Sequence, residues 1–77
     1  MVPRLHQVIA NTFQLTPVEV TDDAGPHSIS QWDSAGHMNL IVALQREFGI
    51  EFGDDEVVEL VSVEAIADAL KRKGVSV

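Results

Sequence analysis

Cysteine is absent from the 77-residue sequence. Without it the chain has no disulfide, no thiolate zinc site and no thiol of its own for covalent chemistry. If the function of this protein needs a thiol, that thiol must come from another molecule. The missing cysteine also agrees with a cytoplasmic location, where disulfides are rare.

Basic residues are scarce. Five Lys and Arg stand against twelve Asp and Glu, which gives a net charge of −7. This negative field repels the phosphates of DNA and RNA, so we expect no nucleic acid partner.

We also expect no metal, because the three histidines are far apart. The segment that starts at Asp22 has Ala24 and Pro26 where a calcium loop needs oxygen donors.

Long hydrophobic runs are absent as well. Polar residues interrupt the N-terminal segment 1–7, which is unlike a signal sequence, and no later stretch is long enough to span a bilayer. With 45% hydrophobic and 22% charged residues, the composition is typical of a soluble globule. We predict a cytoplasmic monomer that does not bind membranes.

The length leaves room for one domain, which we assign to residues 1–77. A domain of this size buries only roughly 60% of its unfolded surface. A closed, water-free active site is hard to build in so thin a core. The small size therefore disfavours an enzyme with such a site.

Helical spacing of apolar residues marks both ends of the sequence. The first predicted helix covers residues 3–14, with Pro3 in its opening turn, where the missing N–H costs nothing. Ser62 is the predicted cap of the last helix, whose basic residues 71–73 lie at the negative end of the helix dipole. Acidic residues at its start favour a short helix over residues 54–60.

The strongest helical signal covers residues 35–49. It follows Asp33 and Ser34, which are both good N-caps, and it ends at a glycine. One apolar stripe is predicted to face the core and consists of Leu40, Ile41, Leu44 and Phe48. A second stripe consists of Ala35, Met38 and Val42. It is either a wide core face, the commoner case, or a surface for docking a partner.

Residues 16–33 show no periodicity and form a long predicted loop. In small domains such loops are usually functional or held by their own side chains. The apolar residues able to hold this one are Val18, Val20, Ile29 and Trp32. We predict an all-α four-helix bundle with a long loop between helices one and two and a short third helix. The predicted core consists of Leu5, Val8, Ile9, Phe13, Leu40, Ile41, Leu44, Phe48, Leu60, Ile66 and Leu70.

Ser34 is the residue whose position in the sequence best indicates a chemical role. At a helix start its hydroxyl lies near backbone N–H groups that can face a phosphate, although a serine there is more often an ordinary N-cap. The enzymatic alternative is a nucleophilic serine with His37, three residues on, as its base. That alternative needs donors for an oxyanion and an orienting partner for the base, and Asp33 lies beside His37 only if the helix already includes it.

The segments Trp32–Leu40 and Glu47–Phe52 resemble the acyl carrier protein family. In that family an Asp-Ser-Leu motif opens the second helix, and a glutamate, an aromatic residue and a short apolar linker follow it. The similarity covers almost the whole chain, including the long first loop, the acidic short helix and the closing helix. The resemblance implies the four-helix fold of these carriers.

The resemblance also implies a function. Ser34, next to Asp33, would receive 4′-phosphopantetheine from coenzyme A through a phosphopantetheinyl transferase. The thiol of that arm would carry acyl groups as thioesters to acyl-loading, condensing or acyl-transferring enzymes, and would supply the sulfur that the chain lacks. The protein would then be a carrier and not an enzyme, and Ser34 would be an attachment point and not a nucleophile that turns over.

The second predicted helix departs from the family pattern on its surface. Ala35 replaces the usual leucine, and Asn39, Gln45 and Arg46 stand where bacterial fatty-acid carriers have acidic residues. Because charges across an interface govern partner choice, we predict a dedicated carrier in a specialised pathway, such as polyketide or fatty-acid-like biosynthesis. The predicted docking residues are Ala35, Met38, Asn39, Val42, Arg46, Asp54, Asp55 and Glu56.

Two alternatives to an acyl carrier stay open. Peptidyl and aminoacyl carriers share the same architecture. A non-catalytic helical protein-interaction module, with no prosthetic group, has the same composition.

Overall fold

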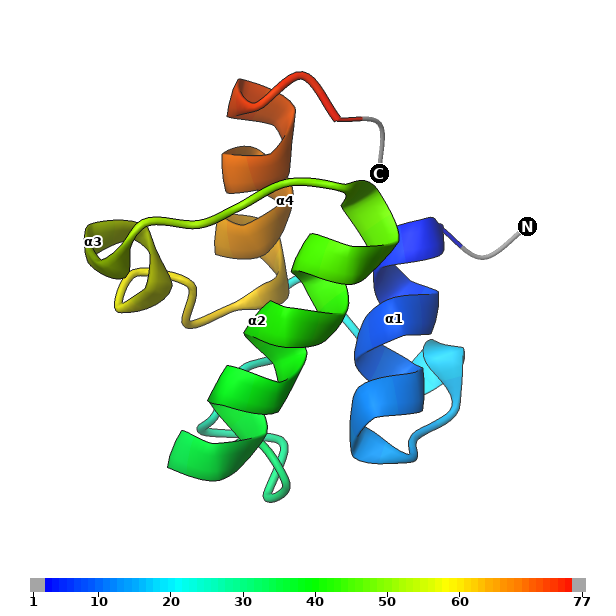
Figure 1. Cartoon of the computed structure of the whole chain (residues 1–77). Helices are drawn as coiled ribbons and strands as arrows, with labels where there is room; N and C mark the ends of the chain where they lie inside the picture. The colour runs from blue at the N-terminus through cyan, green and yellow to red at the C-terminus, as the bar shows by residue number, and fades with distance from the viewer. Residues whose placement is uncertain (1–2, 76–77) are drawn as a thin grey trace.

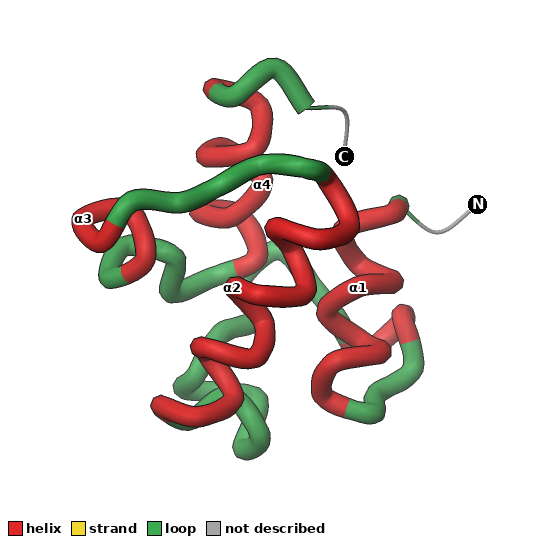
Figure 2. The backbone as a smooth tube through the Cα atoms, viewed as in Figure 1, coloured by secondary structure: helices red, strands yellow, loops and turns green. Residues whose placement is uncertain are grey.

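A computed structural model of the chain describes residues 3–75 and contains four α-helices, with no strand in that part (Figure 1). The helices are α1 Arg4–Phe13, α2 Ser34–Phe48, α3 Asp54–Val57 and α4 Val63–Arg72, and a 3₁₀ turn, η1 Pro17–Glu19, follows α1. Figure 2 shows the long loop between α1 and α2 and the extended linker from α2 to α3. The predicted all-α fold, with its long first loop and short third helix, is confirmed.

Helices α1 and α2 lie side by side and bury their apolar stripes (Figure 1). Leu5 and Ile9 on α1, and Leu40 and Leu44 on α2, are at most 1% exposed. Burial of a side chain of this size stabilises the fold by about 1.5–3 kcal/mol. The apolar stripes that predicted these helices therefore also hold them together.

Both ends of α2 are closed by local chemistry. At the start, the Asp33 side chain accepts a hydrogen bond from the backbone N–H of Gly36. At the end, Gly49 adopts a left-handed conformation (φ 64°) and its N–H donates to the carbonyl of Gln45. Glycine adopts that conformation without the steric cost of a side chain. The helix begins at Ser34, one residue earlier than predicted.

Three of the four predicted side chains hold the long loop. Val20, Ile29 and Trp32 are buried in the core. The prediction for Val18 is wrong, because this residue lies in the short η1 turn and its side chain is 85% exposed. The 3₁₀ turn buries none of its residues, and the apolar residue that turns inward is Val20, directly after it.

Helix α4 begins where the long loop contacts it. The Ser62 hydroxyl accepts a hydrogen bond from the backbone N–H of Ala65, which confirms the predicted cap. The next residue, Val63, donates its backbone N–H to the carbonyl of Ala24 at 2.9 Å. The Glu64 N–H likewise donates to the carbonyl of Asp22 at 3.0 Å, so the loop satisfies two of the free N–H groups at the start of α4.

Helix α3 is a single turn, shorter than the predicted 54–60. After Val57 the backbone hydrogen bonds join residues three positions apart, as in a tighter turn: the Glu59 N–H donates to the Glu56 carbonyl at 3.0 Å. None of the four α3 residues is buried. A turn without an apolar stripe gains little from being extended as a regular helix.

The predicted core is confirmed except at Val8 and Phe48, which are only partly buried and pack against it. Sequence reasoning missed small residues that complete the core, namely Ala10, Ala24 and Ala69. An alanine contributes little to an apolar stripe, so periodicity alone identifies it poorly.

Candidate functional site

Ser34 is the first residue of α2 and is exposed to solvent. Asp33 and Ser34 were both predicted as caps, and the structure assigns that role to Asp33, whose Oδ1 lies 2.8 Å from the Gly36 N. Within residues 3–75 the Ser34 hydroxyl has no hydrogen-bond partner. The neighbouring cap thus leaves this hydroxyl accessible.

Gly36 allows the loop to approach the first turn of α2. A Cβ atom at this position would lie 2.1 Å from the Gln31 carbonyl oxygen and 3.1 Å from Cε1 of Phe13. The Gln31 side chain also donates a hydrogen bond to the Phe13 carbonyl at 3.1 Å. The segment that presents Ser34 is therefore fixed between α1 and α2.

A pocket of about 590 Å³ lies beside Ser34. Most of its lining is apolar, and its residues come from the long loop, from the first turns of α2 and from the α3 region: Pro26, Trp32, Asp33, Ser34, His37, Met38, Val57, Val58 and Val61. A pocket of this kind suits an aliphatic group better than a charged one.

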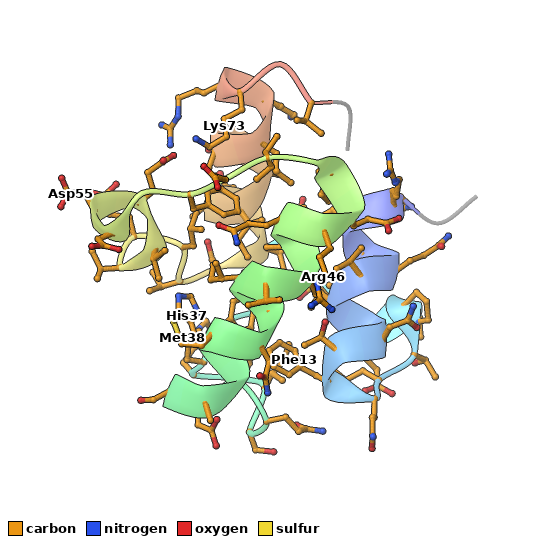
Figure 3. The ribbon with its side chains drawn as sticks, in the orientation of Figure 1. Phe13, His37, Met38, Arg46, Asp55 and Lys73 are labelled. Atoms are coloured by element: carbon orange, nitrogen blue, oxygen red, sulfur yellow. The ribbon has the colours of Figure 1, made fainter. Side chains whose placement is uncertain are left out.

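Trp32 and His37 form a hydrogen-bonded pair at this pocket. The Trp32 indole, 2% exposed, stacks on Phe13 at a centroid distance of 5.4 Å and donates from Nε1 to Nδ1 of His37 at 2.8 Å. The other ring nitrogen, Nε2, lies 2.8 Å from the Val57 carbonyl oxygen. Since an indole N–H only donates and a carbonyl only accepts, His37 carries its proton on Nε2. Figure 3 shows His37 on the side of α2 that faces α3.

These bonds bear on the nucleophilic alternative for Ser34. Both nitrogens of His37 are engaged, by Trp32 and by Val57, and neither is available to accept a proton from the serine hydroxyl. The geometry does not form the serine–base pair that such a mechanism requires.

The predicted docking residues on α2 form one exposed face. Ala35, Met38, Asn39, Val42 and Arg46 are all exposed, and Met38 and Val42 are 52% and 43% exposed. In Figure 3, Met38 lies on the α3 side of this face and Arg46 on the α1 side. The interpretation of the second apolar stripe as a wide core face is therefore wrong. The α1 and α4 helices pack on the other stripe and leave this one uncovered.

The acidic residues of α3 that were predicted to dock partners divide into two kinds. Asp54 and Asp55 are exposed, and Asp55 points away from the bundle (Figure 3). Glu56 is partly buried, and its Oε1 accepts hydrogen bonds from the Gly53 backbone N–H at 2.9 Å and from Nζ of Lys73 at 3.0 Å. The Gly53 N–H first, and Lys73 second, lower the pKa of Glu56.

Two polar residues near the end of α2 are engaged within the fold. Gln45 is half-buried, and its Oε1 accepts the backbone N–H of Phe52 at 3.0 Å, which holds the linker that follows α2. Glu47 pairs with Arg4 of α1 at 3.0 Å. Gln45 thus lies outside the exposed α2 face.

Sequence reasoning did not identify Val58 and Val61 as part of the site. They are 73% and 54% exposed and line the pocket beside Ser34. Their signal in the sequence was the run of valines after α3, which has no helical or strand spacing. Exposed valines without a periodic pattern are weak evidence on their own, and only the fold brings them next to α2.

No group of three or more His, Asp or Glu side chains in residues 3–75 is arranged to hold a metal ion. In the segment considered for calcium, the Asp23 carboxylate accepts a hydrogen bond from the Thr21 hydroxyl at 2.6 Å, and this bond lowers the pKa of Asp23. No helix in the same part of the chain is long and apolar enough to cross a membrane.

Comparison with known proteins decides the family. A family model for the phosphopantetheine attachment site matches residues 3–70. This chain belongs to the acyl carrier protein family. An acyl carrier protein of Thermosynechococcus vestitus is 29% identical over 70 residues, which cover 91% of this chain and 86% of that protein.

Two further relatives extend the comparison. The polyketide-8 synthase acyl carrier protein 2 of Streptomyces avermitilis is 27% identical over 70 residues, covering 91% of this chain and 80% of that protein. The solution structure of a holo acyl carrier protein from Geobacter metallireducens matches with a TM-score of 0.80 and 32% identity, over 90% of this chain and 79% of that one. As a member of this family, the chain is a carrier and not a catalyst, with 4′-phosphopantetheine as its prosthetic group.

Proposed function

We propose that Ser34 is the attachment point of 4′-phosphopantetheine and that the protein presents acyl groups, held as thioesters, to partner enzymes. The observation that carries this proposal is the exposed, unpaired hydroxyl of Ser34. The other serines within residues 3–75 all use their hydroxyls: Ser28 bonds with Gly25, Ser30 with Gln31 and Ser62 with Ala65. Ser34 differs from each of them.

The surroundings of Ser34 fit the prosthetic group. The start of a long helix favours negative charge such as that of a phosphodiester. The apolar pocket beside Ser34 suits the hydrocarbon of an acyl chain, which would enter between α2 and α3. When bound, the arm supplies the terminal thiol that a chain without cysteine cannot provide.

We propose a dedicated pathway, of polyketide or fatty-acid-like biosynthesis, for this carrier. The exposed face of α2 carries Arg46 and Asn39, and the one acidic residue near its end, Glu47, is paired with Arg4. Free negative charge lies instead on Asp54 and Asp55. A partner enzyme that recognises carriers by their surface charge would therefore find a different pattern on this protein than on a carrier with an acidic second helix.

The proposed partners are a phosphopantetheinyl transferase and the acyl-loading, condensing or acyl-transferring enzymes of that pathway. We propose the exposed α2 face together with Asp54, Asp55 and Glu56 as the surface that meets them. The protein would act as a cytoplasmic monomer.

The test is the intact mass of the protein after incubation with coenzyme A and a broad phosphopantetheinyl transferase. We expect the parent to gain the mass of one phosphopantetheine group, and Ser34→Ala to gain none. Ser30→Ala is the matched control, because it removes another exposed serine hydroxyl from the segment just before α2, and it should be modified like the parent. A parent that stays unmodified, or a Ser34→Ala variant that gains the group, contradicts the proposal.

The same experiment separates the alternatives. A helical interaction module without a prosthetic group stays unmodified. A peptidyl or aminoacyl carrier is modified but is then loaded by an adenylating enzyme with an amino acid, whereas the proposed acyl carrier is loaded by an acyltransferase or acyl ligase. The apolar lining of the pocket favours an acyl cargo.

A further inference from the structure

His37 joins three segments of the protein through one side chain. Its Nδ1 accepts a hydrogen bond from Trp32 Nε1 and its Nε2 donates one to the Val57 carbonyl, each over 2.8 Å. Trp32 ends the long loop, His37 lies in the first turn of α2, and Val57 ends α3. All three residues line the pocket beside Ser34.

Apart from the bond to His37, helix α3 is attached here by the half-buried Val57 side chain, which packs against the edge of the core. The helix has no fully buried residue, and Val58 directly after it is 73% exposed. The Val57 carbonyl is one of the helix-end groups without a partner inside α3, and the hydrogen bond that it accepts from the Leu60 N–H is long, at 3.4 Å. The hydrogen bond from His37 satisfies this carbonyl and ties α3 to α2.

We infer that His37 is a positioning residue, which holds α3 at a set distance from the first turn of α2 and thereby shapes the pocket beside Ser34. The inference rests on the proposed function only in its last step, that the pocket receives the cargo of the carrier. The hold of His37 on α3 can be tested without that step.

An imidazole suits this role because one rigid ring presents an acceptor and a donor in different directions. An asparagine amide reaches about as far as Nδ1, and a glutamine amide about as far as Nε2. His37→Asn therefore keeps an acceptor for Trp32 and loses the bond to Val57. His37→Gln does the reverse, and His37→Phe keeps a ring while removing both bonds.

The first experiment uses the unmodified protein, so its outcome does not depend on Ser34. Trp32 is the single tryptophan, and its indole N–H gives one NMR signal that reports the bond to His37. The backbone amides of residues 58–60, directly after α3, report whether α3 is held in place. Loss of one hydrogen bond should speed hydrogen exchange of the group that it protects roughly fivefold.

Each variant has its own expected pattern. His37→Asn should speed exchange of the α3 amides and leave the indole signal near that of the parent, and His37→Gln should do the opposite. His37→Phe should change both. His27→Phe, which alters an exposed histidine of the long loop, is the control and should change neither.

The inference is overturned if His37→Phe leaves both signals at parent values. Should that variant fail to fold, the Asn and Gln variants still decide: opposite patterns support the inference, and the same pattern in both overturns it. A general loss of packing would speed exchange throughout the chain and would not separate the two variants in this way.

The second experiment connects α3 to the cargo. The probe is an octanoyl group loaded on the modified protein, and the signals are the methyl groups of Val58 and Val61, which line the pocket. Octanoyl loading should shift these signals in the parent and shift them less in His37→Phe. Equal shifts in both, or none in the parent, overturn the step from His37 to the cargo. Failure of Ser34 to accept the arm overturns the proposed function instead and leaves the first experiment unaffected.

Discussion

The two sides of α2 are held by different forces. On one side, Leu40 and Leu44 are fully buried among the residues of α1 and α4. On the other side, His37 and Met38 face α3 across an apolar pocket. The nearby α3 has no fully buried residue. It is held by the partial packing of Val57 against the core, by the His37–Val57 bond and by the pair of Glu56 with Lys73.

This difference separates the stability of the fold from the shape of the site. Burial of large apolar side chains contributes several kcal/mol over the first side, whereas each net hydrogen bond on the second contributes about 1 kcal/mol. Changes on the pocket side can therefore alter the site without unfolding the protein. The following predictions test that division, from the core outward.

The largest effect is expected for Leu44→Ala on the buried side of α2. Leu44 is 0% exposed, so truncation leaves a cavity and should lower the free energy of unfolding by about 2–5 kcal/mol. Chemical denaturation monitored by circular dichroism measures the loss. The matched control is Val42→Ala on the exposed side of the same helix, where we expect a change within about 0.5 kcal/mol. Equal losses in the two variants would remove the distinction between the two sides.

An intermediate effect is expected for Asp33→Ala at the boundary between the two sides. The change removes the acceptor for the Gly36 N–H and should cost about 1 kcal/mol of stability, as loss of a helix N-cap typically does. Asp33→Asn keeps a capping oxygen and should recover most of that stability in the same denaturation experiment. If the Asn variant is as unstable as the Ala variant, the carboxylate acts in some way other than as a cap.

The sequence predicted the buried side better than the pocket side. Helical spacing identified Leu40 and Leu44 because burial of a stripe is a property of one helix, which repeats along the chain. The length of α3 and the exposure of Val58 depend on contacts with other segments. The bond from His37 to Val57 joins residues 20 positions apart, and no local pattern reports it.

The candidate site divides in the same way. Ser34 and Asp33 stand in a contiguous motif, so the resemblance to the family located them. Whether Met38 belonged to the core or to the surface could not be decided from its stripe, because either face of a helix can be apolar. That question was answered only by the positions of α1, α3 and α4 around α2.

The smallest effect is expected on the far side of α3, at Glu56. Its pKa is lowered by the Gly53 N–H and then by Lys73, so the carboxylate stabilises the folded chain when it is charged. Because the pKa is lower in the folded chain, this contribution is complete above the pKa of an unfolded glutamate, about 4.3, and is lost as the pH falls through the folded value.

Glu56→Gln should therefore melt at a slightly lower temperature than the parent at pH 7, and the gap should close below about pH 4. The effect is small because the Lys73 and Glu56 side chains are 25% and 37% exposed, so that solvent screens the pair. Glu59→Gln, an exposed acid two residues past the end of α3 with no ion pair among residues 3–75, controls for the change in net charge. A gap of the same size for both variants at pH 7 would mean that the lower melting temperature comes from the change in net charge and not from loss of the Glu56–Lys73 pair. His37 would then be the principal polar attachment of α3.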